Sequence, residues 1–165
     1  FRQYATHIGP TSGSMGYGFP AALAMKTLYP ERAVVCVAGD GDFLMTGQDF
    51  ATAVQYNLPI IVVLADNGLY GTIRMHQERD YPGRVVATEL KNPDFAAYAK
   101  AFGGFGVRID KTADFPAAFA AAQKSGLPSI IHLKVDAEAI TPTTTLTGIR
   151  EKSLAGGGGK PGTHR

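Results

Sequence analysis

Two short β-branched segments, each followed at once by small and acidic residues, constrain the fold most strongly. The segments read AVVCVA at 33–38 and IIVVLA at 60–65. Continuous apolar runs of this length are typical of strands that are buried on both faces of a parallel sheet. The residues between them, 48–56, predict a helix, so the whole stretch predicts one strand–helix–strand crossover.

The same alternation continues along the rest of the chain. Further helices are predicted at 17–28, 69–78, 92–102 and 112–124, and further strands at 105–109 and 129–135. Asn92 is the expected N-cap of the fourth predicted helix, with Pro93 at its first position. We therefore predict an α/β fold in three layers, a parallel sheet with helices on both faces. Residues 1–150 are the expected domain, and 151–165 a flexible Gly-rich tail.

Composition and charge exclude several classes of partner. The 165 residues carry a formal net charge of +2, and the basic residues form no cluster, which argues against nucleic-acid binding. No apolar stretch reaches the roughly 18 residues that a membrane span needs. The lone cysteine, Cys36, is expected to be a buried and inert thiol in a cytoplasmic protein.

Two polar turns stand where the first two predicted strands end. Gly39-Asp40-Gly41-Asp42 follows the first strand, and Asp66-Asn67-Gly68 follows the second. Ligands of open α/β sheets bind outside the carboxyl ends of the strands. A carboxylate and an amide oxygen are hard ligands that suit Mg²⁺, which could clamp a diphosphate at a helix N-terminus. Taken alone, Gly-Asp-Gly is also compatible with a tight turn capped by Asp40.

These turns, together with an upstream segment, resemble a known family. Gly-Asp-Gly, 24 further residues and Asp66-Asn67 resemble the signature of enzymes that bind thiamine diphosphate (ThDP). The upstream segment, GSMGYGFPAA at 13–22, resembles a motif of acetolactate synthases. The resemblance covers residues 5–135 and implies the diphosphate-binding, C-terminal domain of an acetolactate synthase-like enzyme, with the ThDP-binding fold.

The resemblance implies roles for individual residues. Asp40, the Asn67 side chain and the Leu69 carbonyl would bind Mg²⁺. The Gly13 carbonyl would accept a hydrogen bond from the cofactor's amino group, and Met15 would support the bent cofactor. The full set of expected cofactor-binding residues is Gly13, Ser14, Met15, Gly39, Asp40, Gly41, Asp42, Phe43, Asn67, Leu69, Tyr70 and Gly71.

The chain departs from the family pattern at three places. Asp66 replaces an Asn and adds negative charge, and Asp42 replaces a Ser and is expected to point away or to cap the following helix. Met75-His76-Gln77 stands where acetolactate synthases carry Gln-Trp-Glu, and the chain has no Trp. His76 is either a substrate-pocket residue or a surface residue.

Three further expectations concern other charged and titratable residues. The three charged residues Arg74, Glu78 and Arg79 are expected to be solvated. His132 lies in a predicted strand and is expected to be structural. His7 is a further candidate for a place near the cofactor, because it precedes Gly13 by only six residues.

The resemblance also implies partners and leaves the reaction open. The catalytic Glu is expected in an N-terminal pyrimidine-binding domain contributed by another subunit, so this chain would hold half of an active site in a homo-oligomer. The domain itself is expected to be truncated at its N-terminus. The expected reaction is carboligation of a 2-keto acid, a transferase or lyase reaction. A ThDP-dependent decarboxylase, a benzaldehyde-lyase-like enzyme and a non-catalytic nucleotide-binding module are the alternatives.

Overall fold

The computed structural model describes residues 6–157, which form two compact units. The first unit contains the chain up to Asp66 together with Asn92–Lys134, and the second contains Asn67–Lys91 and the chain from Val135 onward. The predicted single domain over 1–150 stays a prediction.

A four-stranded parallel sheet forms the centre of the first unit. Its strand order is β1-β2-β4-β3, so the crossover predicted between the first two strands joins neighbours. The strands are β1 (Val34–Gly39), β2 (Ile60–Asp66), β3 (Phe105–Ile109) and β4 (Ser129–Lys134). In the paired register Gly39 lies beside Ala65, so Asp40 and Asp66 follow directly at neighbouring strand ends. The predicted strands are thereby confirmed, each to within one residue at either end.

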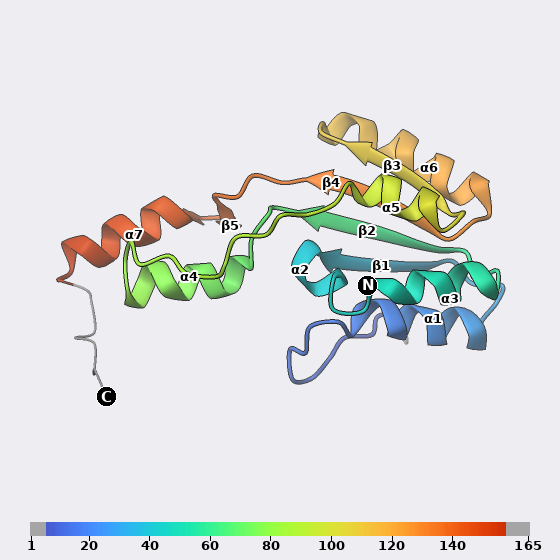
Figure 1. Ribbon diagram of the computed structural model, residues 1–165, viewed down its shortest axis with the longest axis horizontal. Helices are drawn as coiled ribbons and strands as arrows, with labels where there is room; N and C mark the ends of the chain where they lie inside the picture. Colours follow the sequence, from blue (N-terminus) through green and yellow to red (C-terminus); the bar gives the residue numbers. More distant parts are fainter. Residues whose placement is uncertain (1–5, 158–165) are drawn as a thin grey trace. The chain divides into compact units, whose positions relative to one another are not determined.

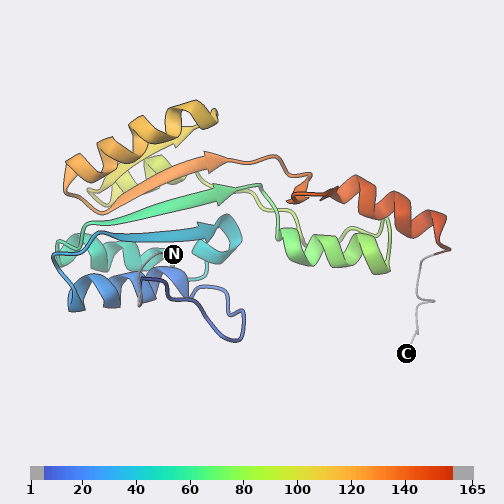
Figure 2. The same cartoon turned by 180° about the vertical axis from the view of Figure 1, so that it is seen from behind.

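Helices cover both faces of this sheet, as Figures 1 and 2 show. Three of them pack on one face through a core rich in phenylalanine, and the fourth packs on the other face through aliphatic residues of β2, β3 and β4. The helices of the first face are α1 (Gly18–Leu28), α3 (Phe50–Gln55) and α5 (Phe95–Ala101), and the opposite helix is α6 (Phe115–Ser125). The predicted three-layer α/β fold is confirmed.

Several helix boundaries differ from the prediction. Short 3-10 turns, η1 (Gly47–Asp49) and η2 (Thr112–Asp114), precede α3 and α6. The predicted start of α5 is wrong, since its N-cap is Asp94 and not Asn92. The Asp94 carboxylate accepts hydrogen bonds from the backbone N–H groups of Ala96 and Ala97 at 2.8 and 3.1 Å. These two bonds satisfy amides that the first helical turn leaves open.

Strand β3 and helix α5 approach each other at backbone level. Gly106 of β3 faces the backbone of Ala96, and a Cβ atom at Gly106 would lie 2.7 Å from the Ala96 carbonyl carbon and 2.8 Å from its Cα. Atoms at these distances overlap. Glycine is therefore required at position 106 for α5 to pack on the sheet.

The second unit combines two helices with a short antiparallel ribbon. Its elements are α4 (Gly71–Asp80), β5 (Ala139–Thr141), β6 (Thr144–Thr145) and α7 (Leu146–Ala155). The Thr145 hydroxyl caps α7 by accepting the Gly148 N–H at 3.0 Å. Residues 151–155, expected to be part of a flexible tail, are helical. Positions 158–165 of that predicted tail lie outside the described residues.

A buried carboxylate joins α4 to α7 within the second unit. The Glu78 side chain is fully buried and accepts hydrogen bonds from Arg150 Nε at 2.7 Å, Arg74 Nε at 2.9 Å and the Gly83 N–H at 3.0 Å. The expectation that Glu78 and Arg74 are solvated is wrong, whereas Arg79 is exposed. The hydrogen bond from Arg150 is the main cause that lowers the pKa of Glu78, against the opposing effect of burial, to about 2.

We expect the substitution Glu78→Gln to lower the free energy of unfolding by about 3 kcal/mol, because it leaves two arginines without their buried partner. Urea unfolding at neutral pH measures this loss. Glu89→Gln is the matched control, since the Glu89 carboxylate is 79% exposed and 3.9 Å from Arg74. The control is expected to lose less than about 1 kcal/mol. Equal losses in the two variants would contradict a stabilising role for Glu78.

The same carboxylate predicts a pH dependence. The pKa of Glu78 is lowered in the folded protein from the ordinary 4.5 to about 2. Its contribution to stability is therefore fully present above pH 4.5 and is lost as the pH falls toward 2. Across this acid range the wild-type protein should lose more stability than the Glu78→Gln variant.

Candidate functional site

The end of β1 places a buried carboxylate next to open space. The chain passes from Gly39 straight into the helical turn α2 (Asp40–Phe43), where a simple turn was expected. Asp40 is 3% exposed, and its Oδ1 atom accepts the Gly41 N–H at 2.9 Å. Within the described range 6–157, and apart from the two chain neighbours of Gly39, no atom lies within 4 Å of the place that a Cβ of Gly39 would occupy. A ligand can therefore approach the backbone closely at this strand end.

A second buried carboxylate, Asp66, ends β2. Its Oδ2 atom lies 2.7 Å from His132 Nε2 and accepts a hydrogen bond from Lys134 Nζ at 2.9 Å. Burial raises the pKa of Asp66, but hydrogen bonds from Lys134, His132 and Asn92 outweigh this effect and hold the pKa well below its usual range. Asp66 is therefore ionised at neutral pH, and its charge is balanced by Lys134. His132 is buried and bonded to Asp66, and the structural role expected of it stays a prediction that these contacts support.

Asn92 connects the two carboxylates. Its Nδ2 atom donates to Asp40 Oδ2 at 2.6 Å and to Asp66 Oδ1 at 2.8 Å. Asn92 was expected to cap a helix, and no local sequence signal points to this contact, because 52 residues separate it from Asp40. The structure thus adds Asn92 to the group of polar residues at the ends of β1 and β2.

The upstream glycine-rich segment is tied to the turn that follows β1. The Gly16 N–H donates to Asp42 Oδ1 at 2.6 Å, and the Thr46 hydroxyl donates to the Gly16 carbonyl at 3.0 Å. Gly16 has a φ of 80°, and a Cβ there would lie 2.8 Å from the Met45 Cβ. The Asp42 side chain therefore points to the Gly16 backbone, and its expected orientation relative to a bound phosphate stays a prediction. The structure brings both sequence motifs of the first unit together.

The remaining expected cofactor residues of the first unit differ in how accessible they are to a ligand. Gly13, Ser14 and Met15 are exposed, and among the described residues no atom beyond the chain neighbours lies within 4 Å of a Cβ placed on Gly13. The Phe43 side chain is 1% exposed and packs edge-to-face against Phe19, so only its backbone is available to a ligand. The roles expected for these residues stay predictions.

The segment 67–71 forms an ordered loop in the second unit. Asn67 Oδ1 accepts the Leu69 N–H at 3.0 Å, and Gly68 adopts a φ of 70°. The Gly68 carbonyl accepts the Leu90 N–H, and the Tyr70 N–H donates to Thr88, so the loop pairs with a second segment of the same unit. Gly71 then begins α4. The metal-binding roles of Asn67 and Leu69 stay predictions.

The three residues in place of the family's Gln-Trp-Glu stretch lie on α4. His76 is exposed. The Gln77 side chain donates to the Val86 carbonyl at 2.8 Å and accepts from the Thr88 hydroxyl at 3.0 Å, so it holds the neighbouring loop. A substrate-binding role for His76 stays a prediction.

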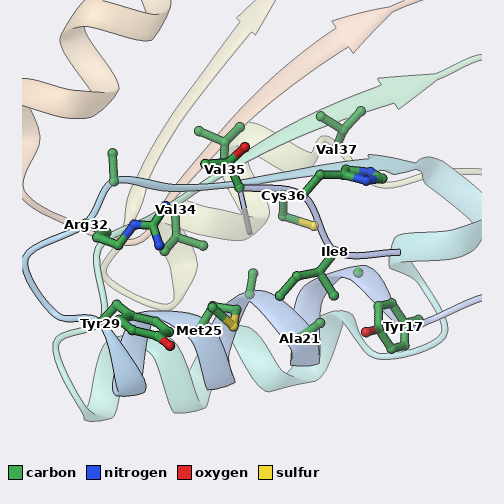
Figure 3. Close-up of a pocket in the computed structure, with 15 residues that line it drawn as sticks. Ile8, Tyr17, Ala21, Met25, Tyr29, Arg32, Val34, Val35, Cys36 and Val37 are labelled. Carbon is green, nitrogen blue, oxygen red and sulfur yellow. The ribbon is translucent and has the colours of Figure 1, made fainter. Parts of the chain in front are cut away.

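An apolar cavity of about 520 Å³ lies between α1 and β1. Figure 3 shows Met25, Val34 and Cys36 among its lining. None of the expected cofactor residues lines it, and His7 does. Cys36 is buried, as expected, and burial, with a smaller effect from the Asp42 charge, raises the pKa of its thiol to about 11, which disfavours the reactive thiolate.

The described residues contain neither a cluster of the usual metal-binding side chains nor a helix able to span a membrane. Between positions 6 and 157, no group of three or more His, Cys, Asp and Glu side chains is arranged to hold a metal ion. The expected Mg²⁺ site consists of the Asp40 carboxylate, the Asn67 amide oxygen and the Leu69 carbonyl. Of these three residues, only Asp40 belongs to the four residue types named. In the same range, no helix has the length and apolar character needed to cross a membrane.

Comparison with known proteins identifies the family. Residues 1–133 match the family described as "Thiamine pyrophosphate enzyme, C-terminal TPP binding domain". The chain is 41% identical over 99 residues to an acetolactate synthase large subunit of Haemophilus influenzae, a match that covers 59% of this chain and 17% of that protein. It is 37% identical over 142 residues to the acetolactate synthase isozyme 2 large subunit of Escherichia coli, a match that covers 81% of this chain and 26% of that protein. The chain therefore spans about a quarter or less of these relatives.

Solved structures give the same result for the fold. A thiamine diphosphate-dependent 4-hydroxybenzoylformate decarboxylase of Rhodococcus jostii superposes with a TM-score of 0.71 at 28% identity, covering 77% of this chain and 24% of that one. A benzoylformate decarboxylase of Polynucleobacter necessarius superposes with a TM-score of 0.69 at 27% identity, and the match covers 77% of this chain and 25% of that one.

Proposed function

Since this chain belongs to the family of C-terminal TPP-binding domains of thiamine pyrophosphate enzymes, we propose that it binds ThDP through a Mg²⁺ ion held by Asp40, Asn67 and the Leu69 carbonyl. The buried carboxylate of Asp40 carries the proposal. It stands at the end of β1, oriented by the Gly41 N–H and next to the open space at Gly39.

The residues of the chain fit this cofactor chemically. Mg²⁺ prefers six oxygen ligands at about 2.0–2.1 Å and usually shares them with phosphate and water. The proposed protein ligands are all oxygens, and the first turn of α2 has N–H groups suited to phosphate oxygens. Gly13 and Met15 would contact the pyrimidine end. When bound, ThDP supplies the electron sink for carbon–carbon bond chemistry.

For the whole protein we propose carboligation of a 2-keto acid, as in an acetolactate synthase. The acetolactate synthase relatives support this reaction. A decarboxylase is the second candidate, because the structural neighbours are decarboxylases of benzoylformate type. We further propose that the catalytic Glu comes from an N-terminal pyrimidine-binding domain of another subunit, within a cytoplasmic homo-oligomer.

Calorimetric titration of the full-length protein with ThDP tests the cofactor assignment. We expect binding that requires Mg²⁺, and its absence would disprove the proposal. NAD binding without a metal would instead support a nucleotide-binding module. Product analysis then separates the reactions. Acetolactate from pyruvate indicates a carboligase, whereas release of free aldehyde from pyruvate or benzoylformate indicates a decarboxylase.

A further inference from the structure

We propose that Asn92 is a positioning residue for the cation site, holding the Asp40 carboxylate in its binding orientation by joining it to Asp66. This inference rests on the proposed function, since it concerns the same cation. It assigns a role to a residue that lies outside both the Gly-Asp-Gly and the Asp-Asn motifs.

The hydrogen-bond geometry gives each N–H of the Asn92 amide its own acceptor. One is directed to Asp40 Oδ2 at 2.6 Å and the other to Asp66 Oδ1 at 2.8 Å. Asp40 Oδ1 accepts the Gly41 N–H, so both oxygens of this carboxylate are oriented by the protein. The carboxylate is thereby held at each end before any cation arrives.

Asp66 is the fixed point of this arrangement. It is 2% exposed, and its other oxygen is held by His132 and Lys134, both on β4. Asn92 itself is placed by the backbone just before α5, whose first turn is fixed by the Asp94 cap. The amide therefore connects Asp40 to the framework of the sheet and to the start of α5.

The side-chain oxygen of Asn92 indicates that the two N–H donors of the amide determine the orientation of the side chain. The Oδ1 atom is buried and has no hydrogen-bond partner among the described residues. An unpaired buried oxygen costs about 1–3 kcal/mol. A flipped amide would place this oxygen against two carboxylates, so the observed orientation follows from the need for two donors.

A neutral donor also suits a cation site better than a charged one. A lysine or arginine at this position would orient Asp40 equally well, but its positive charge would compete with the cation for the carboxylate. An amide leaves the full negative charge available. Residues that orient a metal ligand from outside the metal's own coordination shell typically contribute tenfold to hundredfold in affinity.

The test uses the full-length protein and the variants Asn92→Ala and Asn92→Ser. We expect the Mg²⁺ dissociation constant, measured by calorimetry with saturating ThDP, to rise by about tenfold to hundredfold in Asn92→Ala. The serine variant should show a smaller rise, because one hydroxyl can serve only one carboxylate. The control is Asn57→Gly, which removes an exposed amide at a φ of 52° that glycine also adopts, and its dissociation constant should be unchanged.

Urea unfolding of the cofactor-free variants separates positioning from a purely structural role. Unchanged Mg²⁺ affinity in a folded Asn92 variant, with or without lower stability, would overturn the inference. If Asn92→Ala does not fold, Asn92→Ser decides by the same criterion. If the wild-type protein shows no Mg²⁺-dependent ThDP binding, the proposed function fails and this inference fails with it. If the wild-type protein binds ThDP with Mg²⁺ and the Asn92 variants bind Mg²⁺ equally well, only the positioning role is refuted and the proposed function stands.

Discussion

Replacing Asp40 by alanine in the full-length protein will abolish Mg²⁺-dependent binding of ThDP while leaving the fold in place. The substitution removes the carboxylate proposed to bind the cation, so its effect should exceed the roughly hundredfold limit typical of residues that only support a metal ligand. The fold should survive, because the turn α2 is closed by a backbone hydrogen bond from Leu44 N to Asp40 O at 3.0 Å, which alanine retains.

Calorimetry with ThDP and Mg²⁺ measures the effect, and far-UV circular dichroism checks the fold. Asp110→Ala is the matched control, since Asp110 also directly follows a strand, β3, but its side chain is 62% exposed. This control should bind ThDP like the wild type. An Asp40→Ala variant with wild-type cofactor affinity would refute the role assigned to Asp40.

The second large effect is expected at Gly106. Gly106→Ala should lower the free energy of unfolding by more than about 4 kcal/mol, a loss found only when a named structural requirement is violated. The added methyl group would overlap backbone atoms of Ala96, which cannot rotate away as a side chain can. Helix α5 would have to move off the sheet, and with it Phe95, which is fully buried in the core.

Urea unfolding and the yield of soluble protein measure this loss. Gly9→Ala provides the comparison, because Gly9 is exposed and, within the part of the chain that the structure describes, a Cβ there would meet just the His7 ring, at 3.5 Å or more. Its effect should stay within about 0.5 kcal/mol. If Gly106→Ala were as stable as Gly9→Ala, the close backbone approach would have no energetic significance.

The sequence predicts the features of the first unit that depend on local patterns. The apolar runs identify β1 and β2, and the polar residues after them identify the strand ends where Asp40 and Asp66 lie. The burial of Cys36 and His132 follows from their places within apolar strands. Each of these conclusions requires only a few neighbouring residues, which is why pattern reasoning reaches them.

The features that the sequence did not predict depend on residues far apart in the chain. Asn92 was the predicted cap of α5, but its side chain bonds to carboxylates 52 and 26 residues away, and Asp94 caps the helix instead. Glu78 lies on a helix with few apolar residues, which favours an exposed position. It is buried because Arg150 of α7 pairs with it, 72 residues later.

The hydrogen bonds of Gly16 with Asp42 and Thr46 have a consequence for the energetics of ligand binding. They tie the exposed segment 13–15, through the buried Gly16, to the turn after β1, and all the groups involved belong to the protein itself. The conformational entropy of that attachment is therefore lost during folding and not when a ligand arrives. If the proposed cofactor site includes this segment, that part of the site is preorganised, which leaves more of the intrinsic interaction energy for affinity.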